Sequence, residues 1–164
     1  MSSHAEHLKK QVEAIVHALH ERGETISVAE SLTAGGLANA LTSASGSSAV
    51  FIGGITAYRN EIKESMLKVP ADLIPEHTVV SEEVANAMGD GANRAFGSTW
   101  AIATTGAAGP GSLEGHLPGT VWIAIRGPIN QSIALNLEGD REQVRSGTIS
   151  TAIASFARIL KIQS

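Results

Sequence analysis

Four short stretches of the sequence combine residue types that bind or activate substrates. The first, TISVAESLTAGGLANAL, carries Ser31 and Thr33 and then three small residues, Ala34, Gly35 and Gly36, where a predicted strand passes into a predicted helix. A helix N-terminus offers unpaired backbone N–H groups and a dipole that favours negative charge. The junction therefore suits a phosphate, a carboxylate or the oxyanion that forms when a serine attacks an amide, unless Ser31 or Thr33 only caps the helix.

The second stretch, ITAYRNEIK, places a phenol close to an amine. Thr56 and Tyr58 share one face of a predicted strand, and Asn60 and Lys63 follow at the start of a predicted helix. Such a pair can position or activate a nucleophile, and Lys63 can act as a base only if burial lowers its pKa. The alternative is that Tyr58 completes the edge of the core and Lys63 is solvated.

The third stretch, TTGAAGPG, closes another predicted strand with Thr105, Gly106 and Gly109. It has the glycine content of a phosphate-binding loop but neither the Lys-Ser/Thr ending of a P-loop nor the spacing of a dinucleotide-binding loop. Open α/β sheets bind ligands at the carboxyl ends of their strands, so this stretch is a candidate for the same site as the first two.

The fourth stretch, GDREQVR, holds two arginines at the start of the last predicted helix. Arg141 and Arg145 are four residues apart and therefore lie on one face. Forked donors beside a helix N-terminus bind phosphate or carboxylate groups well. The alternative is a solvated face on which both arginines pair with neighbouring acids.

The elements that must position these residues alternate between helix and strand and end in a hairpin. This order predicts a single-domain, three-layer α/β/α sandwich around a mixed sheet. A β-bulge is expected at Gly53-Gly54, Asn60 and Ser81 are expected to cap helices, and Asp140 with Gln143 forms a capping box. The predicted helices cover 5–21, 32–41, 60–69, 82–96 and 141–162, and the predicted strands cover 25–29, 48–58, 99–106, 120–127 and 132–139.

Composition excludes several classes of protein. The chain of 164 residues is 43% apolar with a net charge of −4, which is typical of a folded domain and not of a general nucleic-acid binder. It has no cysteine, no metal-binding pattern of acids and histidines, and neither a signal peptide nor a membrane-length apolar run. We expect a cytoplasmic protein that uses no metal or cofactor and binds neither nucleic acid nor membrane.

Taken together and in order, the stretches AESLTAG, GGITAYRNEIKESMLKVP, TTGAAGPG…PGTVWIAI and GDREQVR resemble the C-terminal domain of competence/damage-inducible CinA proteins, the nicotinamide-nucleotide amidohydrolase family. The resemblance runs from about Val12 to Leu160 and is to the stand-alone form of that domain. It implies hydrolysis of the carboxamide of nicotinamide mononucleotide to nicotinate mononucleotide and ammonia, in pyridine-nucleotide salvage, by a homodimer without metal or cofactor.

The resemblance also implies roles for matching residues. Ser31 would be the nucleophile, assisted by Tyr58 and Lys63. Backbone N–H groups near Ala34 to Gly36 would then stabilise the oxyanion. The remaining implied positions are Asn60 beside the pair, Thr105 and Gly106 at the reacting end, Gly109 in the adjacent loop, and Arg145 with help from Arg141 at the nucleotide phosphate.

Two departures from the family pattern leave alternatives open. Position 34 is alanine where the family usually has glycine, and the loop GSLEGHLPGT has His116 and Leu117 where Lys-Pro is common. The alternatives are an amidohydrolase of another small amide and a non-catalytic nucleotide-binding module that regulates a partner. The identity of the general base is also open.

Overall fold

A five-stranded mixed sheet forms the centre of the protein, in a computed structural model that describes residues 2–162. The three strands on one side of it are parallel, and the last two form an antiparallel hairpin on the other side. In spatial order the strands are β2 (Phe51–Thr56), β1 (Ile26–Glu30), β3 (Trp100–Gly106), β4 (Thr120–Arg126) and β5 (Gln131–Asn136).

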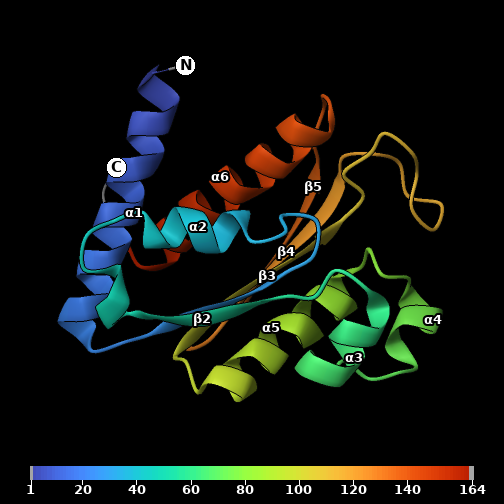
Figure 1. Cartoon of the computed structure of the whole chain (residues 1–164), viewed down its shortest axis with the longest axis horizontal. Coiled ribbons are helices and arrows are strands. Elements are labelled where there is room, and N and C mark those ends of the chain that lie inside the picture. The colour runs from blue at the N-terminus through green and yellow to red at the C-terminus, as the bar shows by residue number, and fades with distance from the viewer. Residues whose placement is uncertain (1, 163–164) are drawn as a thin grey trace.

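Helices cover both faces of this sheet, so the predicted three-layer α/β/α architecture is confirmed (Figure 1). One face carries α1 (Ser2–Arg22), α2 (Gly36–Thr42) and α6 (Arg141–Ile159), and the other carries α3 (Asn60–Leu67), α4 (Leu73–His77) and α5 (Glu82–Phe96). Each helical layer has its own apolar core. β1 and β3 lie between the two cores and are buried along their whole length.

The connections after the parallel strands leave the sheet on opposite faces. The chain passes from β1 to β2 through α2 and the short 3₁₀ helix η1 (Ser47–Ala49), and from β2 to β3 through α3, α4 and α5 (Figure 1). Because neighbouring connections diverge at the carboxyl ends of these strands, a crevice opens there. α3 packs closely on α5, since a Cβ at Gly91 would collide with the carbonyl of Leu67.

Several predicted boundaries are correct because they depend on local chemistry. Ser81 caps α5 through a bond from Val84 N at 3.3 Å. Asp140 and Gln143 form the reciprocal capping box of α6. The hairpin of β4 and β5 and the irregular loop between β3 and β4 are also present as predicted.

Other predictions of local structure are wrong. The second helix begins at Gly36 and not at Leu32, because residues 31–35 form a turn with positive φ at Ala34 (48°) and Gly35 (92°). Asn60 is the first residue of α3 and does not cap it, the cap position being Arg59. The helix α4 and the 3₁₀ helix η1 were not predicted.

The expected bulge lies one residue earlier than predicted. The register between β1 and β2 shifts so that Ile26 pairs with Phe51 and Ser27 pairs with Gly53. The two glycines at 53–54 instead allow close packing, since a Cβ at either would meet the side chain of Phe96 or Val28.

Candidate active site

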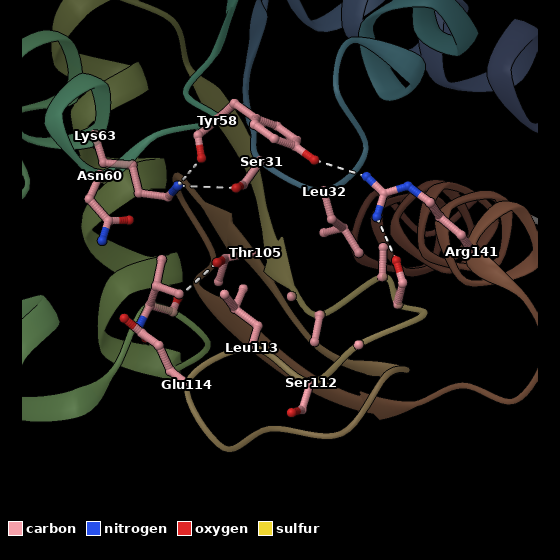
Figure 2. Close-up of a pocket in the computed structure, with 16 residues that line it drawn as sticks. Ser31, Leu32, Tyr58, Asn60, Lys63, Thr105, Ser112, Leu113, Glu114 and Arg141 are labelled. Carbon is pink, nitrogen blue, oxygen red and sulfur yellow. Dashed lines mark hydrogen bonds between the residues drawn. The ribbon is translucent and has the colours of Figure 1, made fainter.

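A pocket of about 320 Å³ lies at the carboxyl ends of the parallel strands (Figure 2). Ser31 and Leu32 contribute from the turn after β1, and Tyr58, Asn60 and Lys63 from the start of α3 and the segment before it. The other lining residues are Val79, Thr105, Gly106, Ala107, Ala108, Gly109, Gly111, Ser112, Leu113, Glu114 and Arg141. The structure thus brings together residues from all the stretches that the sequence singled out.

A buried serine–lysine pair lies at the closed side of the pocket. The Lys63 ammonium donates to Ser31 Oγ and to the carbonyl of Tyr58, both at 3.1 Å (Figure 2). It also donates to the carbonyl of Ala57 at 2.8 Å. Lys63 is only 1% exposed, so the alternative of a solvated lysine is wrong. Its three donors have three fixed acceptors, which holds Nζ against the serine hydroxyl.

Burial makes this lysine a usable base. Desolvation of the ammonium lowers the pKa of Lys63 to about 8, and the nearby Glu114 carboxylate opposes that shift. When Lys63 loses a proton, its two remaining N–H groups can stay on the carbonyls of Ala57 and Tyr58. The lone pair then faces Ser31 Oγ and can accept the hydroxyl proton.

The turn after β1 is held by the side chain of Glu30 and by backbone hydrogen bonds of its own. The buried Glu30 carboxylate accepts from the N–H groups of Leu37 at 2.7 Å and Ala38 at 3.1 Å, so the start of α2 is already occupied. The N–H of Ala34 donates to Ser31 O and that of Gly36 to Thr33 O. Two of the three N–H groups expected to stabilise an oxyanion, those of Ala34 and Gly36, are therefore already paired within the turn.

The predicted substrate contacts at Thr33, Ala34, Gly35 and Gly36 are likewise not in the pocket lining. Thr33 is fully buried, and its hydroxyl lies 2.8 Å from that of Thr104. These residues shape the turn that carries Ser31. Sequence reasoning missed the capping role of Glu30, for which the acid directly before Ser31 was the only signal.

The loop after β3 supplies the opposite wall. Thr105, Gly106 and Gly109 line the pocket as predicted from their position at the strand end. The Thr105 hydroxyl, however, donates to the carbonyl of Val79 at 2.8 Å, so it ties β3 to the segment before α5. Glu114, in the same loop, also lines the pocket but was not predicted as a site residue, although its loop departs from the family pattern.

The two arginines have different surroundings. Arg141 lies at the pocket mouth, where its guanidinium donates to Tyr58 Oη at 2.9 Å and to the carbonyl of Gly109 at 2.7 Å (Figure 2). Arg145 does not line the pocket. Its guanidinium donates to the carbonyls of Leu32 at 3.0 Å and Thr33 at 3.4 Å. Although both arginines start on one helix face, only Arg141 is available to a ligand in the pocket.

Residues 2–162 contain no group of three or more acidic, histidine or cysteine side chains that could hold a metal ion. Over the same residues, every helix is too short or too polar to cross a membrane.

Comparison with known proteins identifies the family. The family model for the CinA C-terminal domain matches residues 8–160. This chain belongs to the CinA C-terminal domain family. A CinA-like protein of Parasynechococcus marenigrum is 44% identical over 156 residues, which cover 92% of this chain and 37% of the relative. A CinA-like protein of Synechococcus sp. is 46% identical over 150 residues, covering 91% of this chain and 36% of the relative. The chain therefore spans little more than a third of the length of these relatives.

Solved structures of CinA proteins share the fold over nearly the whole chain. The CinA superfamily protein of Klebsiella pneumoniae 700603 has a TM-score of 0.90 at 30% identity, covering 95% of this chain and 99% of that one. The competence/damage inducible protein CihA of Agrobacterium tumefaciens has a TM-score of 0.89 at 30% identity, with coverages of 94% and 95%. The predicted resemblance to the CinA C-terminal domain is thus confirmed.

Proposed function

We propose that this CinA domain is an amidohydrolase that converts nicotinamide mononucleotide to nicotinate mononucleotide and ammonia. The observation that carries the proposal is the 3.1 Å contact between Ser31 Oγ and the buried amine of Lys63. A module that only bound nucleotides would have no use for a buried lysine aimed at a serine, because burying that amine costs stability. The identity of the substrate is taken from the family resemblance.

In the proposed reaction, Lys63 is the base that the sequence left unassigned. Neutral Lys63 takes the proton from Ser31 Oγ as the oxygen attacks the carboxamide carbon, giving a tetrahedral oxyanion and a lysine ammonium. The ammonium returns that proton to the departing nitrogen, so that ammonia leaves and Ser31 carries a nicotinoyl ester. Water then attacks the ester with Lys63 again as base, releasing the acid and restoring the serine.

The oxyanion needs hydrogen-bond donors other than those of Ala34 and Gly36. The backbone N–H of Leu32 directly follows the nucleophile and has no acceptor within residues 2–162, and the same holds for the N–H groups of Ala108 and Gly109. All three residues line the pocket. We assign the oxyanion donors to this set, since an oxyanion beside Ser31 is best stabilised by preorganised backbone donors that are not already paired.

The phosphate end of the substrate is assigned to Arg141, not to Arg145 as the family pattern implied. Arg141 is the pocket arginine, and its present partners are the phenol of Tyr58 and a backbone carbonyl. A phosphate is a stronger, charged acceptor and can replace either partner. Binding energy at this remote group then orients the carboxamide at Ser31.

The test is ammonia release from nicotinamide mononucleotide by the purified protein and by a Ser31→Ala variant. We expect release by the parent protein and a loss of at least a thousandfold in the variant, with an unchanged circular dichroism spectrum. Release that survives in Ser31→Ala would remove the serine mechanism and leave direct attack by water. A parent protein that binds the nucleotide without releasing ammonia would favour the binding module. Release from other small amides alone would favour a different amidohydrolase.

A further inference from the structure

Glu114 places a carboxylate in the pocket on the side of the serine–lysine pair. Its Oε2 accepts from the backbone N–H of Val79 at 2.6 Å, while Oε1 makes no hydrogen bond within the described residues 2–162. The charge of Glu114 acts on Lys63: it opposes the lowering of the lysine pKa that burial causes. Figure 2 shows Glu114 on the same side of the pocket as Lys63, with Arg141 on the opposite side.

The carboxylate is presented by a tight turn that is anchored at both ends. Leu113 and His116 exchange two backbone hydrogen bonds of 3.0 and 2.9 Å, and Glu114 between them adopts a positive φ of 47°. His116 Nε2 lies 2.7 Å from the hydroxyl of Thr78, one residue before the Val79 that Glu114 binds. The turn thus holds Glu114 through contacts of its own, in the part of the loop that departs from the family pattern.

The pocket therefore has a cationic end and an anionic end. The cationic end is the Arg141 guanidinium, and the anionic end is the partnerless oxygen of Glu114, on the side of the pocket that also holds Lys63. Nicotinamide mononucleotide has the complementary arrangement, with a phosphate at one end and a cationic pyridinium carboxamide at the other. Its acid product differs at the reacting end alone, where a carboxylate replaces the carboxamide.

We propose that Glu114 is a specificity-determining residue that selects the carboxamide over the carboxylate, and so favours the substrate over the product. This inference rests on the proposed function, because it names the discriminating group of the same site. The NH₂ of the amide can donate to Glu114 Oε1, whereas the product carboxylate has no donor and is repelled by a like charge. Repulsion between two carboxylates in a partly solvated pocket amounts to about a tenfold change in Kd.

The inference is tested by binding, in a Ser31→Ala background that cannot form the acyl-enzyme. Calorimetry would give the Kd of nicotinamide mononucleotide and of nicotinate mononucleotide, with Glu114 present and with Glu114→Gln. Glutamine retains an acceptor for Val79 N–H and replaces the charged free oxygen by an uncharged NH₂ donor. Glu82→Gln makes the same charge change at an exposed position outside the pocket and is the matched control.

We expect the glutamine variant to lower the preference for the amide about tenfold, chiefly through tighter binding of the acid, while the control leaves the preference unchanged. An unchanged ratio of the two Kd values would overturn the inference, as would an equal weakening of both ligands, which indicates a structural role. Absence of ammonia release by the parent protein would overturn the proposed function while the Kd ratio still decides the role of Glu114. Failure to bind either nucleotide would overturn both.

Discussion

Raising the pH from 7 to 9 is expected to increase kcat/KM for nicotinamide mononucleotide about tenfold. The reason is that only the neutral amine of Lys63 can accept the proton of Ser31, and the pKa of this lysine is lowered to about 8. About a tenth of the lysine is neutral at pH 7 and about nine tenths at pH 9, and the rate should follow that fraction. The phosphate of the substrate titrates near 6 and does not change in this range.

The assay is ammonia release at subsaturating nucleotide, measured at fixed ionic strength between pH 6 and 10. Lys63→Met keeps most of the length of the side chain and removes the base, so it should lose on the order of a hundredfold to ten-thousandfold in rate and lose the pH dependence. Glu114→Gln removes the carboxylate that opposes the lowering of the lysine pKa, and should move the midpoint of the profile to lower pH.

The pH dependence of the free energy of unfolding is a second measure of the pKa of Lys63. Because the pKa of Lys63 is about 8 in the folded protein and 10.5 for an unperturbed lysine side chain, the folded state has lost this proton at pH values where the unfolded chain retains it. The free energy of unfolding, relative to that of Lys63→Met, should therefore rise between pH 8 and pH 10.5, by up to about 3 kcal/mol. A rate that is flat from pH 6 to 9, or a stability difference that does not rise between pH 8 and pH 10.5, would refute the assignment of Lys63 as the base.

Three further predictions concern the surroundings of the site. In steady-state kinetics, Arg141→Met should raise KM for nicotinamide mononucleotide about tenfold to a hundredfold and leave KM for nicotinamide riboside, which lacks the phosphate, unchanged. Arg145→Met should not change KM for one of these substrates relative to the other. Glu30→Ala leaves two N–H groups of α2 without an acceptor and should lower the free energy of unfolding by about 3 kcal/mol in urea titration, whereas a loss below about 1 kcal/mol would contradict its capping role. Gly91→Ala should reduce thermal stability and activity together because its Cβ would collide with a backbone carbonyl of α3, while Gly147→Ala, with 3.3 Å to a flexible leucine side chain, should be close to neutral or stabilising.

The sequence predicted those parts of the fold that depend on local patterns. The buried runs of β1 and β3, the Ser81 cap and the capping box at Asp140 each follow from a few neighbouring residues, and the order of elements was enough to predict three layers. The turn at 31–35 was missed although Gly35 disfavours a helix interior. Only the buried carboxylate of Glu30, which binds the N–H groups of Leu37 and Ala38, shows where that helix starts.

The site was predicted less completely, since its roles depend on contacts between distant segments. Arg141 and Arg145 are equivalent by spacing, and only the packing of α6 against the turn after β1 directs Arg145 to backbone carbonyls 112 and 113 residues away. Whether Lys63 was buried or solvated could not be decided from its neighbours. The homodimer and the cytoplasmic location inferred from the sequence stay predictions.

The serine–lysine pair joins the two helical layers of the protein. Ser31 precedes Leu32, which belongs to the core under α2 and α6, whereas Lys63 comes from α3, whose Leu67 belongs to the core under α5. Partial opening of the α3 layer would separate the amine from the hydroxyl while the rest of the sheet stayed folded. Enzymatic activity then becomes a reporter of this local equilibrium. It should disappear at a lower denaturant concentration than the bulk of the secondary structure, together with faster amide hydrogen exchange in α3.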